Sequence, residues 1–275
     1  MKNVKLSQKL TESALMLALT TILSIVPLIE LPYGGSITAA SMVPMVIIAY
    51  RYGFRWGLLT GAAYGLIQLL FGLKNLSYAT SAVAAIAIIL LDYLFAFMST
   101  AFAGFFRKSR SQASGLVCAT LVVCAVRYLF HVISGCTVWA GLSIPTADAL
   151  LYSLIYNATY LLPETIINAI AALYLGSALC FTKPRLTMAQ KSQGVPRPAR
   201  ILSAAGGLII LGALTAVVVM VFSQLQNPDT GEFNIQGIQS VNLPVVLEIV
   251  GATAVIVAVL AVIRISLIRR QSEQG

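Results

Sequence analysis

Apolar residues are concentrated in eight long segments separated by short polar or turn-forming stretches. The segments cover residues 9–29, 37–51, 56–73, 80–106, 113–136, 148–182, 201–223 and 244–268. A helix needs about 20 apolar residues to cross the hydrocarbon core of a bilayer. Segments 37–51 and 56–73 are short for a full span. Segment 148–182 is long and contains Pro163, so we expect it to be tilted, kinked or broken. The pattern predicts an all-α integral membrane protein.

Composition supports this class. The chain is 59% hydrophobic and 10% charged, and its mean hydropathy is +0.89, whereas soluble domains carry about 25% charged residues. The first apolar run is long and lacks a small-residue cleavage site, so it does not match a cleavable signal peptide. The formal charge of +9 would suit a nucleic-acid-binding protein, and the positions of the charges decide between the two interpretations.

The basic residues alternate with the apolar segments. If the N-terminus is inside, 16 of the 18 Lys and Arg residues lie on the inner side. These are Lys2, Lys5, Lys9, Arg51, Arg55, Arg107, Lys108, Arg110, Lys183, Arg185, Lys191, Arg197, Arg200, Arg264, Arg269 and Arg270. Lys74 alone is outside, and Arg127 is intramembrane. The positive-inside rule therefore predicts a multi-pass protein of the cell membrane with both termini cytoplasmic. The basic excess orients the chain and attracts anionic lipid, so no nucleic-acid partner is expected.

A polar, basic, proline-containing stretch divides the chain. It covers residues 183–200 and is interpreted as a cytoplasmic linker. The six segments within residues 1–182 form one predicted membrane domain. Residues 201–275 hold two further segments of Val, Ile, Leu and Ala, with Glu248 near the start of the last one. We interpret 201–275 as an appended transmembrane helical hairpin.

The fifth segment and the loop after it contain unusual polar residues. Arg127 and His131, the only histidine, are four residues apart and therefore project from nearly the same face of a helix; Trp139 follows them. An arginine at the centre of a membrane-spanning helix costs about 2.5–3.5 kcal/mol on insertion scales. We therefore expect these side chains to face a cavity and not lipid.

The neighbouring segments contribute further polar and aromatic groups toward the same predicted outer side. The fourth segment supplies Asp92 and Tyr93, and the sixth supplies Tyr152, Tyr156, Asn157, Tyr160 and Glu164. Aromatic faces and a carboxylate suit a flat heterocycle that is cationic or rich in nitrogen. An aromatic face stabilises a cation by about 0.5–2 kcal/mol, and a carboxylate accepts hydrogen bonds from an amino group.

Each of these residues also has a structural interpretation. Asp92, Arg127 and Glu164 would form a buried ion-pair network without any ligand, and His131 would be a hydrogen-bonded packing residue. Tyrosines and Trp139 would mark the membrane interface. The convergence of three adjacent segments on one side favours a binding pocket.

Four blocks of sequence, in order, resemble one known family. They are LPYGGSITAASMVPMVIIAYRYGFRWGLLTGAAYGLIQLLFG, LDYLFAF, RYLFHVISGCTVW and YSLIYNATYLLPE. Together they resemble the thiamine-specific substrate-binding (S) component, the ThiT/YuaJ family, of energy-coupling factor (ECF) transporters. The resemblance covers about residues 1–182 and does not cover 201–275.

The resemblance implies a six-helix membrane bundle that binds thiamine near its outer face. It implies Asp92 as the carboxylate that holds the two rings of thiamine, with the surrounding groups Tyr93, His131, Trp139, Tyr152 and Asn157. Arg127 matches a position that is basic in the family, and Tyr78 matches an aromatic before the fourth segment. The family carboxylate is Glu, so Asp92 is one methylene shorter and a water could intervene. Residues 31–36 resemble a gating loop.

The resemblance also implies protein partners. Family members associate with a transmembrane coupling protein and two cytoplasmic ATPases. Ala14 and Ala18 in the first segment are four residues apart, a spacing that lets helices approach closely. Alanine-rich membrane chains produce such spacing by chance, but in the family this surface docks on the coupling protein. The chain contains no GxxxxGK[ST] motif, so transport energy is expected from partner ATPases or an ion gradient.

Two other classes of function are compatible with parts of the sequence. A stand-alone, proton-coupled secondary transporter of a cationic heterocycle would use Asp92, His131 or Glu164 as a proton relay, although no convincing internal repeat was found. An intramembrane hydrolase would use Ser134 and His131, but no nucleophile turn is present. Neither a cofactor nor a metal is expected, because the four cysteines show no CxxC spacing and there is a single histidine.

Overall fold

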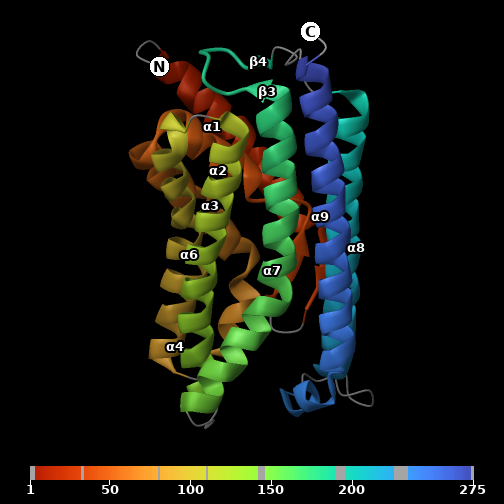
Figure 1. The fold of residues 1–275 in the computed structure, drawn as a ribbon. Helices are drawn as coiled ribbons and strands as arrows, with labels where there is room; N and C mark the ends of the chain where they lie inside the picture. Colours follow the sequence, from red (N-terminus) through yellow and green to blue (C-terminus); the bar gives the residue numbers. More distant parts are fainter. Residues whose placement is uncertain are drawn as a thin grey trace. The chain divides into compact units, whose positions relative to one another are not determined.

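The computed structural model describes residues 4–31, 34–79, 81–109, 111–141, 146–189, 196–225 and 235–273. Within these ranges some side chains lie outside the description, Trp139 among them. The chain forms two compact units, Met1–Met188 and Ala189–Gly275. In Figure 1 the first unit is coloured from red to green and the second from cyan to blue.

The first unit is a helical bundle. Its principal helices are α1 (Leu6–Ile25), α2 (Val43–Tyr52), α3 (Phe54–Phe71), α6 (Gln112–Gly141) and α7 (Thr146–Ala178). A further span between α3 and α6 is built from α4 (Ala82–Ala87), η3 (Ile88–Phe95), α5 (Ala96–Met98) and η4 (Ser99–Lys108), and the short helix η2 (Leu73–Tyr78) precedes it. Strands β3 (Leu179–Cys180) and β4 (Thr187–Met188) pair antiparallel after α7.

Helix α2 is the centre of this bundle. All ten of its residues are buried, and it packs against α1, α3, η4, α6 and α7. A helix that is apolar on every side is buried on every side, and the sequence VPMVIIAY has that character. The outward faces of the surrounding helices expose large apolar side chains such as Leu15, Leu59 and Leu129. An apolar exterior around an apolar core is typical of a protein solvated by lipid.

The span of residues 82–108 changes its helical winding three times. It begins as an α-helix, becomes a π-helix over Ile88–Phe95, returns to an α-helix over Ala96–Met98 and ends as a 3₁₀-helix over Ser99–Lys108. Helix α3 lies close against the middle of this span, because Gly61 and Gly65 have no side chain. A Cβ atom at Gly61 would lie 2.7 Å from the Phe97 carbonyl oxygen, and one at Gly65 would lie 2.6 Å from that of Tyr93. Gly65 therefore lets α3 approach the π-helix closely, and Gly61 lets it approach α5.

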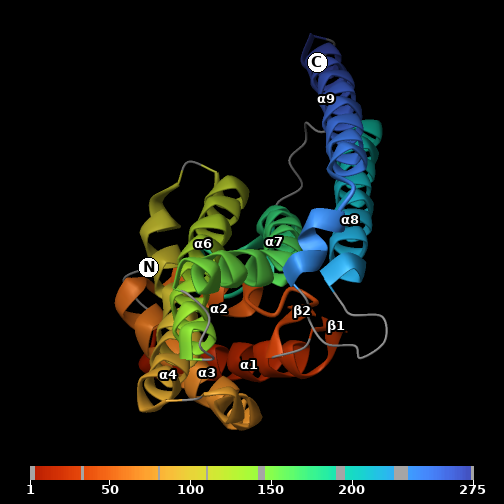
Figure 2. The same ribbon diagram turned by 90° about the horizontal axis from the view of Figure 1, so that it is seen from below.

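A small hairpin follows α1. Strands β1 (Pro27–Glu30) and β2 (Ser36–Thr38) are antiparallel, with Glu30 opposite Ser36 and an irregularity between Pro27 and Ile29. Figure 2 shows this hairpin beside α1. The turn is closed by a hydrogen bond from the backbone amide of Leu31 to the Gly35 carbonyl, 2.7 Å long. The hairpin occupies residues that the apolar pattern had assigned partly to membrane segments.

The second unit is a helical hairpin. It consists of α8 (Arg197–Leu225), the 3₁₀-helix η5 (Ile235–Ser240) and α9 (Leu243–Glu273), and α8 packs against α9. Gly206 of α8 faces Leu260 of α9, where a Cβ atom would meet the leucine side chain at 3.9 Å. Most side chains of both helices remain exposed within the unit, as expected for a hairpin surrounded by lipid.

The all-α membrane class predicted from the sequence is confirmed. Five helices in the described ranges are long and apolar enough to cross a membrane: Ala82–Lys108, Gln112–Val138, Ala149–Ala178, Arg197–Val221 and Leu243–Arg270. α1 and α3 are helical over 20 and 18 residues but are not among these five.

Two boundaries differ from those drawn on the sequence, and the sixth segment is bent but unbroken, within the range of outcomes expected for it. Segment 37–51 is helical only from Val43, because its start forms β2 and a turn. The fifth helix continues to Gly141, so Trp139 lies within α6 and not beyond its end. Helix α7 runs unbroken through Pro163 and changes direction along its length (Figure 1).

Candidate functional site

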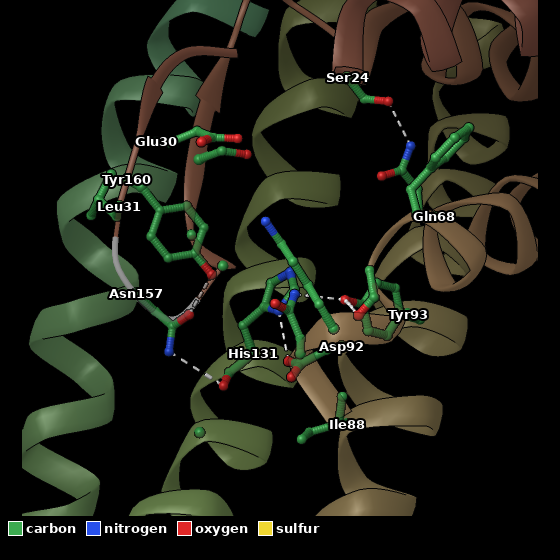
Figure 3. Close-up of a pocket in the computed structure, with 18 of the residues that line it drawn as sticks. Ser24, Glu30, Leu31, Gln68, Ile88, Asp92, Tyr93, His131, Asn157 and Tyr160 are labelled. Carbon is green, nitrogen blue, oxygen red and sulfur yellow. Dashed lines mark hydrogen bonds and ion pairs between the residues drawn. The ribbon is translucent and has the colours of Figure 1, made fainter. Parts of the chain in front are cut away.

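A cavity of about 520 Å³ lies at one end of the first unit. Its walls come from the C-terminal ends of α1 and α3, the β1–β2 hairpin, η2, η3, α6 and α7. Figure 3 shows Asp92 and His131 at its centre, with Tyr93 on one side and Asn157 and Tyr160 on the other. Ser24 and Gln68 form a separate part of the wall, where the Gln68 amide donates a 2.6 Å hydrogen bond to the Ser24 hydroxyl.

The π-helix places Asp92 and Tyr93 at the cavity. Both residues lie within Ile88–Phe95 and line the cavity wall. A π-helical turn is wider than an α-helical one and is found frequently at functional sites. Consecutive residues subtend a smaller angle in the wider turn, so Asp92 and Tyr93 both reach the same cavity. No feature of the residue pattern predicted this change of winding.

Asp92 is held by two donors from α6. The Nδ1 atom of His131 lies 2.7 Å from Asp92 Oδ1, and the Ser134 hydroxyl donates a 2.7 Å hydrogen bond to Oδ2. The Asp92 side chain retains 25% of its exposure and that of His131 11%. A carboxylate offers about four acceptor positions, so each Asp92 oxygen keeps capacity for a hydrogen bond from a ligand.

Arg127 fixes the tautomer of His131. Its Nε–H donates to His131 Nε2 over 3.2 Å. A guanidinium has hydrogens to donate and no acceptor, so His131 Nε2 carries the lone pair and the imidazole proton sits on Nδ1. That proton points to Asp92. His131 is therefore a neutral imidazole in this arrangement, and it orients the carboxylate without adding a charge.

Arg127 is itself paired with Glu164 of α7. Its Nη1 lies 2.6 Å from Glu164 Oε2, and the Glu164 side chain is 1% exposed. The guanidinium also lies over the Phe97 ring, 5.1 Å from its centroid. A buried charge is stable only when it is paired and hydrogen-bonded. The Arg127–Glu164 pair therefore contributes no net charge to the cavity.

The β1–β2 hairpin completes the shell around Glu164. The Thr38 hydroxyl donates to Glu164 Oε1 at 2.5 Å, and it also contacts the Ser41 hydroxyl at 2.7 Å. On the same hairpin, the Gly35 amide donates to the Tyr156 hydroxyl of α7 at 2.9 Å. The hairpin is thus anchored to α7 at two points. Movement of the hairpin would disturb the acidic partner of Arg127.

Among the charged side chains at the cavity, one carboxylate has no cation to balance its charge. Glu164 and Arg127 cancel, and the exposed Glu30 and Lys74 contribute one charge of each sign at the rim. Asp92 remains, because its partners His131 and Ser134 are neutral. Glu164 does not itself line the cavity, but together with it the charged lining residues carry a net charge of about −1, which suits a monocation.

Aromatic hydroxyls and amides surround this carboxylate. The Tyr93 hydroxyl accepts from Asn75 Nδ2 at 2.8 Å and donates to the Gly72 carbonyl at 3.0 Å. The Tyr160 hydroxyl donates to Asn157 Oδ1 at 2.6 Å. Asn75 Oδ1 is buried, and the described residues give it no hydrogen-bond partner. Because Asn75 lines the cavity, a small rotation of its amide would bring this acceptor to a donor on a ligand.

Most of the residues predicted to bind the ligand meet at this cavity. Asp92, Tyr93, Arg127, His131, Asn157 and Tyr78 all line it. Tyr152 is buried in α7 and is not among the lining residues. The side chain of Trp139 lies outside the described residues. Ala14 and Ala18, predicted to contact a partner, are exposed on α1.

Several polar residues that support the site were not predicted as part of it. Thr38 and Ser41 support Glu164, Ser134 holds Asp92, and Asn75 holds Tyr93. These are small polar residues of common types. Their spacing in sequence carries no signal, because their partners lie on other elements.

A multi-pass helical bundle with a polar cavity at one end defines an integral membrane protein built around a polar cavity. The chain belongs to the thiamine transporter protein (Thia_YuaJ) family, whose model matches residues 10–184. It is 35% identical over 196 residues to the thiamine transporter ThiT of Bacillus subtilis strain 168, which covers 67% of this chain and 96% of that protein. A solved structure of ThiT from Listeria monocytogenes is 26% identical, with a TM-score of 0.49, and covers 61% of this chain and 92% of that one.

Proposed function

We propose that the cavity binds thiamine. The observation that carries this proposal is the uncompensated charge of Asp92 in a cavity lined by tyrosines and amides. Thiamine joins an aminopyrimidine to a cationic thiazolium, and both rings are flat. A carboxylate attracts the cation and accepts hydrogen bonds from the amino group. Tyrosine faces add cation–π attraction. Membership of the family supports the same ligand.

The residues divide into those that touch the ligand and those that position others. Asp92 and Tyr93 of η3, His131 of α6 and Asn157 of α7 would contact thiamine, as would Tyr78 at the rim. Arg127 would not be a direct contact, because a cation beside a cationic ligand is unfavourable and its donors already reach Glu164 and His131. Trp139 and Tyr152 are proposed as ligand contacts from the family resemblance alone.

Calorimetric titration of the purified protein with thiamine tests this proposal. Asp92→Asn keeps the shape of the side chain and removes its charge. We therefore expect the affinity for thiamine to fall at least tenfold, about 1.4 kcal/mol. Glu248→Gln is the matched control, because it removes a carboxylate from α9, outside the cavity lining. Equal affinities of Asp92→Asn and the unmodified protein would refute the assignment.

We further propose that transport depends on an ECF coupling protein and two ATPase subunits. The outward face of α1 supports this, since Ala14 and Ala18 are exposed beside the exposed side chains of Leu15 and Leu19. Small residues amid larger apolar ones let a second membrane helix approach closely. Both termini would then be cytoplasmic, in the cell membrane. The hairpin of residues 201–275 is proposed to be an additional membrane unit.

A stand-alone, proton-coupled carrier would need a path for protons. The series Asp92, His131, Arg127 and Glu164 is continuous in space. An arginine is not deprotonated in proteins, so Arg127 interrupts the series between His131 and Glu164. Uptake into vesicles that contain the purified protein alone, with an imposed proton gradient, separates the two mechanisms. We expect no accumulation without the partners, and accumulation would favour the carrier.

A further inference from the structure

A second cavity, of about 600 Å³, lies at the end of the first unit opposite the thiamine cavity. It is lined by Tyr50, Arg51, Gly104, Phe105, Arg107, Lys108, Phe181 and Thr182. The polarity of the helices fixes its position. α7 passes the first cavity at Tyr156 and ends near Phe181, and the span that begins near Ile88 ends at Lys108. The two cavities share no lining residue.

Arg51 lines this cavity, and all three nitrogens of its guanidinium donate hydrogen bonds within the protein. Its guanidinium pairs with Glu12 at 3.0 Å and donates to the carbonyl oxygens of Phe181, Lys183 and Pro184. The side chain is 0% exposed. This cluster ties α1 and α2 to the segment after α7. Because Glu12 neutralises it, Arg51 adds no net charge to the cavity.

Arg107 and Lys108 provide the uncompensated charge. Both are exposed, and neither takes part in the ion pairs found among the described residues. No lining residue is a carboxylate. Gly53 leaves room for the Arg107 side chain, because a Cβ atom on Gly53 would lie 2.8 Å from Arg107 Nη1. The backbone angle φ of Gly53 is +92°, a conformation that also favours glycine. The cavity therefore presents two cations to an anion.

An aromatic rim adjoins these cations. Phe105 is 65% exposed, stacks on Phe54 with ring centroids 4.8 Å apart, and meets Phe102 edge-on at 6.0 Å. A small hydrated anion gains no favourable contact from an exposed aromatic ring, whereas the acyl chains of a phospholipid can cover the ring. Basic pockets between membrane helices are known to bind lipid headgroups.

We propose that this cavity binds the phosphate of an anionic membrane phospholipid. Arg107 and Lys108 hold the headgroup, while the Phe105 rim contacts the acyl chains. The Arg51–Glu12 cluster beneath keeps α1, α2 and the residues after α7 in register, so lipid occupancy stabilises this end of the bundle. The proposal is independent of thiamine binding.

The test measures thermal stabilisation of the purified full chain in detergent by three additives: phosphatidylglycerol, phosphatidylcholine and inorganic phosphate. We expect phosphatidylglycerol alone to raise the melting temperature. The double variant Arg107→Gln/Lys108→Gln should bind phosphatidylglycerol about twenty-five-fold more weakly, about fivefold for each cation lost. The variant's melting temperature without lipid checks its fold, and the mass of co-purified phospholipid gives a second measure.

The control is Arg55→Gln/Arg185→Gln, which removes two exposed basic residues that do not line the cavity. It should keep the response to phosphatidylglycerol. An equal loss in the control would show attraction by general surface charge and overturn the site. Equal stabilisation by inorganic phosphate would show a small-anion site and overturn the assignment to lipid. The absence of any response in the unmodified protein would also overturn it.

Discussion

Arg127 donates from Nε to His131 Nε2 across one turn of α6, at 3.2 Å. The Arg127 guanidinium therefore has two roles, one for each of its two partners. Its Nη1 neutralises Glu164, and its Nε sets the proton of His131 toward Asp92. A lysine at this position would have the charge but not the fixed fork of donors. The geometry makes Arg127 a positioning residue for the carboxylate that faces the ligand.

Loss of His131 should weaken thiamine binding. His131→Ala removes a donor to Asp92 and leaves Arg127 Nε without its acceptor, so we expect affinity to fall at least tenfold, about 1.4 kcal/mol. Trp139→Ala is expected to have an effect of the same size, on sequence grounds alone. Calorimetric titration measures both. Unchanged affinity in both variants would contradict the pocket.

Glu164 should be important for stability more than for ligand contact. Glu164→Gln leaves the Arg127 charge buried without its partner, and breaking a buried pair in this way costs about 3–5 kcal/mol. We expect a large fall in the unfolding temperature. The double variant Glu164→Gln/Arg127→Met removes both charges and should recover part of the loss. If Glu164→Gln unfolds at the original temperature, the ion pair is not a structural element.

Asn75 offers an acceptor that the protein leaves unused. Its Oδ1 is buried without a partner in the described structure, while its Nδ2 holds Tyr93. Asn75→Ala should therefore weaken thiamine binding about five- to tenfold, the scale of one hydrogen bond, with a smaller effect on stability. Asn168→Ala is the control, since Asn168 Oδ1 also lacks a partner but does not line the cavity. Equal effects on binding would exclude a ligand contact at Asn75.

The α1 surface should separate binding from uptake. Ala14→Leu/Ala18→Leu places bulky groups on an exposed helix face, so close packing of a partner helix is blocked while the cavity is intact. Uptake of labelled thiamine in cells that supply the coupling module should be abolished, and affinity of the purified variant should be retained. Ala252→Leu on exposed α9 serves as the control. Lost affinity would mean that the two alanines are packing positions.

Much of the fold could be predicted from the chain because lipid imposes long apolar runs. α6 and α7 follow their predicted segments. Arg127, His131 and Asn157 were predicted to face a cavity because polar side chains in membrane-spanning helices are costly when they face lipid, and all three line the cavity. Helix spacing along α6 also predicted that Arg127 and His131 share a face.

Contacts between distant elements could not be predicted in this way. No local propensity encodes the π-helix that presents Asp92 and Tyr93, or the close approach of Gly65 to its backbone. The partner of Glu164 on the hairpin, Thr38, is 126 residues away in sequence. Residue type and spacing limited the ligand to a flat cationic heterocycle, and family membership narrowed it to thiamine.

We propose that Asp92, the carboxylate of the cavity whose charge is uncompensated, selects a cationic ligand. The most direct measurement compares thiamine with a neutral isostere, in which a carbon replaces the thiazolium nitrogen, by calorimetric titration of the unmodified protein and Asp92→Asn. We expect the unmodified protein to bind thiamine at least tenfold more tightly than the isostere, about 1.4 kcal/mol, and Asp92→Asn to lose this preference. An equal preference for thiamine in both proteins would contradict it.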